Sequence, residues 1–152
     1  LDHFEMDTMI EDAQGISIPE IFEKHGEDYF RKLESDLLMD LLDNNGACVI
    51  SSGGGVVERT DNMLAISDRA VSVWLKVDVP VLLGRVCGGE GRPMLLKGGA
   101  PAKTLERLLN GRKRLYSKAD VHIENNGNVG AEIIACKIAQ EIIRQFNEEI
   151  EG

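Results

Sequence analysis

The chain has 152 residues, 43% of them hydrophobic, and a formal net charge of −9. This length suits one domain with a substantial core. No apolar run reaches the ~18 residues that a membrane span requires, and the negative charge argues against a nucleic-acid partner, because phosphates attract a basic face.

The N-terminal residues predict a strand followed by a short helix. His3–Asp7 completes the strand, and Glu5 and Asp7 stand two positions apart, which predicts that they share one face of it. The helix then runs to Gly15, because glycine is typical of the position just after a helix. From the residues alone, Asp7 is equally suited to cap this helix.

The next two helices have clear sequence signals. Ser17 and Glu20 form a capping box at the start of the first helix. Glu27–Asp43 forms the second, because phenylalanine and leucine recur in it at helical spacing. Arg31 and Glu34 lie three residues apart on another face of this helix, where a solvated ion pair is the simplest interpretation.

A triglycine, Gly53–Gly55, follows the predicted strand Ala47–Ser51. Glycines leave the backbone bare and able to adopt positive φ. A ligand can then approach the main-chain N–H groups, at the carboxyl end of a strand, where open α/β sheets bind their ligands. The alternative is a flexible turn.

The rest of the chain continues the alternation of strands and helices, which predicts an α/β fold with a mainly parallel sheet. Residues 87–103 include a stretch too rich in glycine for a stable element, and loops of this length are usually functional or disordered. The last helix is predicted to point five apolar residues inward: Ile133, Ile134, Ile138, Ile142 and Phe146. The remaining elements are, in order, a helix capped by Thr60, a strand over Val71–Lys76, a helix from Asp78 toward Arg85, a helix around Lys103–Leu115, a strand over Ala119–Glu124 and a helix over Val129–Ile150.

Five short motifs follow one another along the chain: Glu5-Met6-Asp7-x-x-Ile10-Glu11, Gly26-Glu27-x-x-Phe30-Arg31-x-x-Glu34, Gly53-Gly54-Gly55-Val56-Val57, Arg92-Pro93-Met94-Leu95 and Arg112-x-x-Leu115-Tyr116. Each is weak alone, but in this order and at these intervals they make the chain resemble shikimate kinase, a small P-loop kinase. The resemblance implies a three-layer P-loop-kinase-like α/β fold with a mainly parallel sheet. It also implies transfer of the γ-phosphoryl group of MgATP to the 3-hydroxyl of shikimate.

The resemblance assigns the main roles at the site. Asp7 would orient the shikimate hydroxyl and accept its proton. Arg31 and Arg112 would clamp the shikimate carboxylate, which a guanidinium fork matches and a lysine does not. The amides of Gly53–Gly55 would bind the substrate ring, and Arg92 would close on the ATP phosphates from a lid at about residues 87–103.

Three further residues receive supporting roles from the same resemblance. Glu34 would hold Arg31, Arg85 would stack on adenine, and Glu5 would lie near the Mg²⁺ that enters with ATP. From the residues alone, Arg92 also fits a turn, and Arg112 also fits a solvated basic face.

The sequence contains no G-x-x-x-x-G-K-[ST], whose amides cradle phosphates and whose hydroxyl holds Mg²⁺. The segment 98–104 resembles it superficially, but Ala102 stands before the lysine and the segment lies in the lid. In the family this motif follows a central first strand, ahead of the part where this chain begins. We therefore expect a fragment that lacks this strand and phosphorylates nothing alone.

The parent protein is expected to be a cytoplasmic monomer that binds shikimate and ATP, with no nucleic-acid or membrane partner. The three cysteines of these 152 residues are odd in number and far apart, which indicates free thiols in a reducing compartment. The alternatives are a non-catalytic shikimate-kinase-like binding module and a related kinase for another hydroxylated acid.

Overall fold

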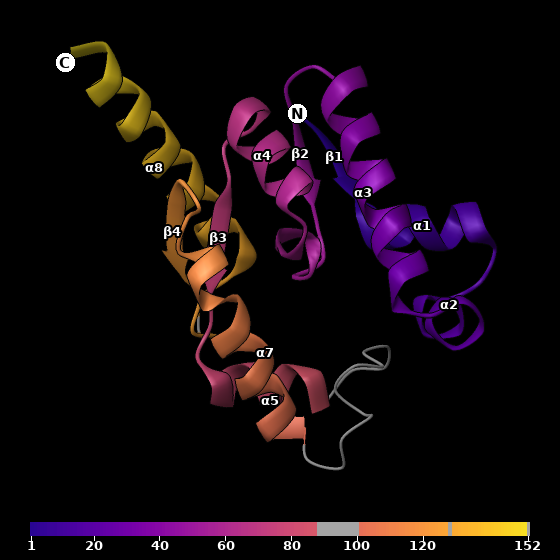
Figure 1. Ribbon diagram of the computed structural model, residues 1–152. Helices are drawn as coiled ribbons and strands as arrows, with labels where there is room; N and C mark the ends of the chain where they lie inside the picture. Colours follow the sequence, from indigo (N-terminus) through magenta and orange to yellow (C-terminus); the bar gives the residue numbers. More distant parts are fainter. Residues whose placement is uncertain (88–100, 128, 152) are drawn as a thin grey trace. The chain divides into compact units, whose positions relative to one another are not determined.

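The computed structural model describes residues 1–87, 101–127 and 129–151. These residues form two compact units, the first made of residues 1–70 and the second of the residues from 71 onward. Each unit holds two parallel strands and the helices that alternate with them (Figure 1). The predicted α/β class is therefore confirmed. The expected single domain stays a prediction, and most of the expected lid lies outside the described residues.

The first unit pairs two short strands in parallel, so that Asp2 lies opposite Cys48 and Glu5 lies opposite Ser51. Its elements are, in order, β1 (Asp2–Glu5), α1 (Met6–Gln14), α2 (Ile18–His25), α3 (Glu27–Asn44), β2 (Cys48–Ser51), the 3₁₀ turn η1 (Val56–Glu58) and α4 (Thr60–Arg69). The triglycine therefore connects the carboxyl end of β2 to η1.

The predicted helix boundaries of this unit are mostly confirmed. Gly15 adopts a positive φ of 67° and its N–H donates to the carbonyl of Glu11 at 2.8 Å, which ends α1. At the start of α2, the Ser17 hydroxyl donates to a carboxylate oxygen of Glu20 at 2.7 Å. This hydrogen bond is the main reason why the pKa of Glu20 is lowered.

Two sequence-based expectations about where a strand ends and where a helix begins are wrong. The first strand ends at Glu5, and Asp7 lies in the first turn of α1, so the two side chains do not share a strand face. An acidic residue in the first turn interacts favourably with the helix dipole, which explains the earlier helix start. Thr60 is the first residue of α4 rather than its cap, because Arg59 holds the cap position.

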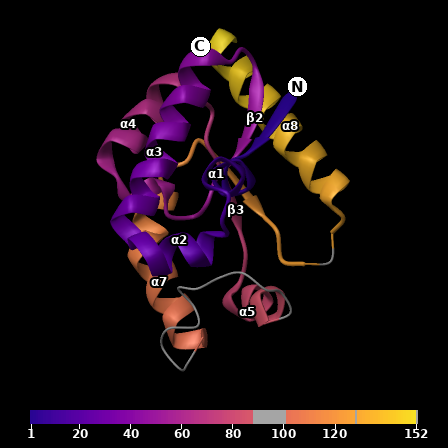
Figure 2. The same cartoon turned by 90° about the vertical axis from the view of Figure 1, so that its right-hand side faces the viewer.

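The long helix α3 forms the core of the first unit with the face that its leucines predicted. Leu38 and Leu41 are buried against Met6 and Val56, while Phe30 belongs to a second cluster with residues of α1 and α2. α3 contacts both α1 and α4, and Figure 2 shows α3 and α4 side by side. This packing fixes the face of α3 that carries Arg31 and Glu34.

The second unit is built around the parallel pair β3 and β4, with Val73 opposite Val121 and Lys76 opposite Glu124. Its elements are β3 (Val73–Lys76), α5 (Val79–Cys87), α7 (Pro101–Tyr116), β4 (Val121–Glu124) and α8 (Ala131–Glu151). The strands are joined at their start, because Asp120 accepts hydrogen bonds from both the amide and the hydroxyl of Ser72, at 2.8 and 2.6 Å.

The inward face predicted for α8 is correct only in part. Ile134 is buried against β4, with Ile138 and Ile142 beside it. Ile133 and Phe146, however, are 55% and 51% exposed. The two-stranded sheet covers only a narrow stripe of the helix, so residues at the edges of the apolar face stay outside. Among the described residues, no helix is both long enough and apolar enough to cross a membrane.

Candidate active site

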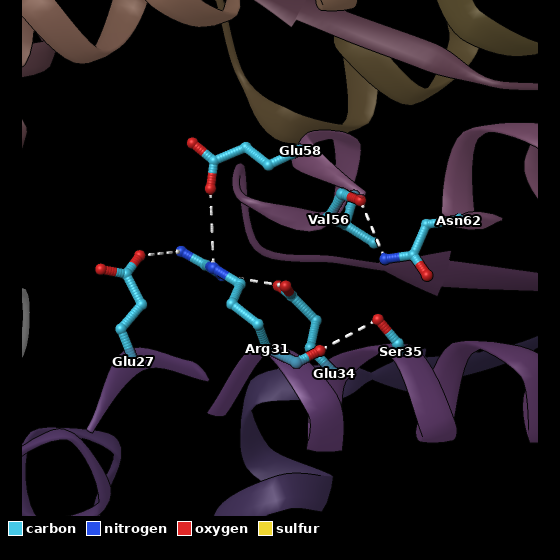
Figure 3. A network of polar contacts seen from close by, with 7 residues as sticks. All are labelled: Glu27, Arg31, Glu34, Ser35, Val56, Glu58 and Asn62. Atoms are coloured by element: carbon cyan, nitrogen blue, oxygen red, sulfur yellow. Dashed lines mark hydrogen bonds and ion pairs between the residues drawn. The ribbon is translucent and has the colours of Figure 1, made fainter. Parts of the chain in front are cut away.

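A buried ion pair on α3 forms the centre of the candidate site. Arg31 Nη1 donates to Glu34 Oε2 at 2.9 Å, and the two side chains are 12% and 1% exposed (Figure 3). The pair is therefore not the solvated pair that helical spacing alone suggested. A guanidinium and a carboxylate are retained in a protein interior only when they are paired in this way.

The triglycine contacts this pair through its last residue. A β-carbon at Gly55 would lie 2.3 Å from Arg31 Cζ, so any other residue there would displace the guanidinium from this position. Gly55 has a φ of −87°, and Gly53 also avoids positive φ. The expected use of positive φ is therefore wrong here, and close approach of a side chain to the backbone is the reason for glycine.

Asp7 joins the same group of residues at Gly53. A β-carbon at Gly53 would lie 3.1 Å from Glu34 Oε1 and 3.5 Å from Asp7 Oδ1. Asp7 is half-buried in the first turn of α1, whereas Glu34 is fully buried on α3. Two carboxyl groups from different helices thus flank the glycine that follows β2.

Two carboxylates that the sequence-based assignment left out also surround Arg31. Glu27 Oε1 lies 3.4 Å from Nη2, and Glu58 Oε2 lies 3.6 Å from Nε (Figure 3). Glu27 could have been recognised, because it stands four residues before Arg31 on the same helix. Glu58 could not, because its contact depends on how η1 folds back over α3.

A buried asparagine holds the turn that follows the triglycine. Asn62 is 1% exposed, and its side-chain amide donates to the carbonyl of Val56 at 2.9 Å (Figure 3). This hydrogen bond joins η1 to α4 and so helps to fix the position of Glu58. Nothing in the sequence pattern identified Asn62 for this role.

The other predicted site residues belong to other elements of the chain. Glu5 is the exposed last residue of β1. Arg85 lies on α5 and Arg112 on α7, both in the second unit. Arg92 lies outside the described residues. Within the described residues, no three acidic, histidine or cysteine side chains form a group that could hold a metal ion.

Comparison with known proteins identifies the family. The family model for shikimate kinase matches residues 1–146 of the chain. The chain belongs to the shikimate kinase family. This confirms the family that the five motifs indicated.

Individual shikimate kinases agree with this membership. The enzyme of Nitrobacter winogradskyi is 45% identical over 117 residues, which are 77% of this chain and 54% of that protein. The enzyme of Bradyrhizobium diazoefficiens is 40% identical over 146 residues, which are 96% of this chain and 67% of that protein. The chain thus spans between half and about two thirds of the length of these relatives.

A solved structure supports the fold. The shikimate kinase of Acinetobacter baumannii in complex with shikimate matches with a TM-score of 0.87 at 32% sequence identity. The match covers 95% of this chain and 79% of that one. The likeness extends over both units of the chain.

Proposed function

We propose that this chain carries the acceptor site of a shikimate kinase, which transfers the γ-phosphoryl group of ATP to the 3-hydroxyl of shikimate. The observation that supports this most strongly is the buried guanidinium of Arg31, held between Glu34 and Gly55. A rigid guanidinium fork is suited to recognise a carboxylate through two parallel hydrogen bonds.

The other acceptor-site residues have complementary roles. Asp7 orients the hydroxyl and accepts its proton, since a carboxylate within hydrogen-bond reach can act as a general base. Glu34 holds Arg31 in place, and the amides of Gly53–Gly55 bind the substrate ring. Arg112 supplies the second half of the carboxylate clamp.

The nucleotide contacts complete the proposal. Arg92 stabilises the charge on the transferred phosphoryl group, and Arg85 stacks on adenine. Mg²⁺ commonly uses one or two protein carboxylates together with phosphates and water, so an exposed carboxylate such as Glu5 is suitable near it. The fold would be of the three-layered P-loop-kinase type with a mainly parallel sheet, in a cytoplasmic monomer.

One observation favours a second function. These 152 residues contain no G-x-x-x-x-G-K-[ST], so no phosphate-binding loop of that kind can be assigned to them. A non-catalytic module that binds shikimate without turning over ATP would need only the acceptor site.

Kinetics on a fusion protein test both functions. The chain is joined at Leu1 to a β-strand, a G-x-x-x-x-G-K-[ST] loop and a helix, and ATP-dependent phosphorylation of shikimate is measured. In a kinase, Arg31→Ala and Arg112→Ala each lower kcat/KM. The decrease corresponds to a loss of about 2–5 kcal/mol of transition-state stabilisation, as expected for a buried charge contact. Arg69→Ala is the control, because its partner Asp43 is exposed and the pair lies outside the site.

The outcomes separate the proposals. Turnover that depends on both arginines supports the kinase. Shikimate binding without turnover in the fusion supports the binding module. Turnover that is unchanged in both arginine variants would refute the assignment of the clamp.

A further inference from the structure

A fully buried polar side chain lies beside the candidate site without belonging to it. Asn62 is the third residue of α4 and is 1% exposed. Its side-chain amide donates to the carbonyl of Val56 at 2.9 Å (Figure 3), whereas its Oδ1 atom is buried and makes no hydrogen bond with any described residue. A buried oxygen without a hydrogen bond is unfavourable. The benefit of an asparagine here therefore has to come from the carbonyl that it holds.

That carbonyl belongs to the residue that directly follows the triglycine. The side chain of Val56 is 4% exposed and packs in the core with Leu38 and Leu41 of α3. Its N–H donates to the carbonyl of Gly53 at 3.2 Å, which closes the turn over the glycines. Val56 is thus held by its side chain, by its N–H and, through Asn62, by its carbonyl.

A turn of three glycines depends on contacts of this kind. Glycine has no side chain that could pack, and it loses more conformational freedom on folding than any other residue. The conformation of Gly53–Gly55 is therefore set by the groups around it, which are the guanidinium of Arg31 against Gly55 and the hydrogen bonds of Val56. Without the hydrogen bond from Asn62, the turn has more conformations to lose when a ligand binds, and this loss weakens binding.

We propose that Asn62 is a positioning residue of the acceptor site, which holds the triglycine in its ligand-binding conformation through the carbonyl of Val56. The inference rests on the proposed function, because that function assigns the amides of Gly53–Gly55 and the guanidinium of Arg31 to the acceptor. Asn62 acts through the backbone of Val56 and touches no ligand. Its removal therefore weakens acceptor binding without removing a contact to the acceptor.

Asn62→Leu separates this role from a contribution to folding. Leucine has a similar size, keeps α4 packed, and removes both the donor and the oxygen that lacks a hydrogen bond. Ile21→Val is the control for loss of stability, because Ile21 is fully buried in the second cluster of this unit, which contains no residue of the turn. Arg31→Ala tests the clamp itself, and Asn62→Ala repeats the test if the leucine variant does not fold.

Three measurements are made on the 152-residue chain and its variants. Calorimetric titration gives the affinity for shikimate, and urea unfolding gives the stability. Hydrogen exchange, with and without saturating shikimate, reports how often the backbone amides of residues 53–58 and of α2 open.

The expected result is local to the turn. Asn62→Leu lowers shikimate affinity about fivefold to twentyfold, the range for loss of one buried hydrogen bond. In the free variant, the amides of residues 53–58 exchange faster than in the wild type and those of α2 do not, and saturating shikimate slows residues 53–58 again. Ile21→Val lowers the urea midpoint but changes shikimate affinity less than about twofold, since it lies outside the turn.

Three outcomes would overturn the inference. In the first, Arg31→Ala abolishes shikimate binding but Asn62→Leu binds as tightly as the wild type. In the second, exchange at residues 53–58 is the same in Asn62→Leu and in the wild type. In the third, Ile21→Val loses as much affinity as Asn62→Leu. If Arg31→Ala leaves shikimate binding intact, or if the wild type does not bind shikimate, the proposed acceptor site fails first, and the role of Asn62 fails with it.

Discussion

The guanidinium of Arg31 lies directly against the backbone of Gly55, where a β-carbon would be 2.3 Å from Cζ. The triglycine and Arg31 of the G-E-x-x-F-R-x-x-E motif are therefore in direct structural contact. A side chain at this glycine has to displace the arginine, although the two residues are far apart in sequence.

Gly55→Ala is expected to damage ligand binding more than folding. The group that must move is the end of a flexible side chain, so the free energy of unfolding falls by only about 1–3 kcal/mol, as in an overpacked core. Shikimate affinity falls at least about tenfold, because small displacements of binding groups are costly. Gly46→Ala is the control, since no atom lies within 4 Å of its β-carbon position. Equal affinities in the two variants would contradict the close contact.

Glu34→Ala is expected to destabilise the first unit strongly. Glu34 is 1% exposed, and its loss leaves Arg31, whose side chain is 12% exposed, without its buried partner. Breaking a buried pair in this way costs about 3–5 kcal/mol, whereas exposed pairs contribute at most about 1 kcal/mol. Urea unfolding of Glu34→Ala and of Asp43→Ala, which removes an exposed partner of Arg69, measures the difference. A loss of the same size in both variants would contradict this role.

The sequence predicted which residues lie together better than it predicted how they are arranged. The motifs identified Asp7, Arg31, Glu34 and the triglycine, because each carries a distinctive spacing. Periodicity could not show that the Arg31–Glu34 pair is buried, since i,i+3 spacing is the same on either side of a helix. The reason for glycine at position 55 was also inaccessible, because it depends on a tertiary contact with α3. Glu58 and Asn62 carried no local signal.

The link between Ser72 and Asp120 predicts a pH dependence of stability. Partial burial raises the pKa of Asp120, but hydrogen bonds from the Ser72 hydroxyl and amide outweigh it and lower the pKa below its ordinary value. A carboxyl whose pKa is lower in the folded state stabilises the folded protein at pH values above its unfolded pKa, which is about 3.9. This stabilisation is lost as the pH falls through the pKa of the folded state.

Unfolding free energies of the wild type and Asp120→Asn, measured between about pH 6 and pH 2.5, test this link. The wild type is expected to be more stable by less than about 1 kcal/mol at pH 6, because the carboxyl is largely exposed. The difference should disappear at the acidic end. A difference that grows as the pH falls would contradict the sign of the shift.

The most direct measurement is calorimetric titration of shikimate into the 152-residue chain, with Arg31→Ala and Arg69→Ala alongside. The acceptor site of Asp7, Arg31, Glu34 and Gly55 predicts saturable binding by the wild type and by Arg69→Ala. It predicts binding at least about tenfold weaker in Arg31→Ala, as for loss of a charged anchor. Equal affinity in all three proteins, or no binding by the wild type, would contradict the proposed acceptor site.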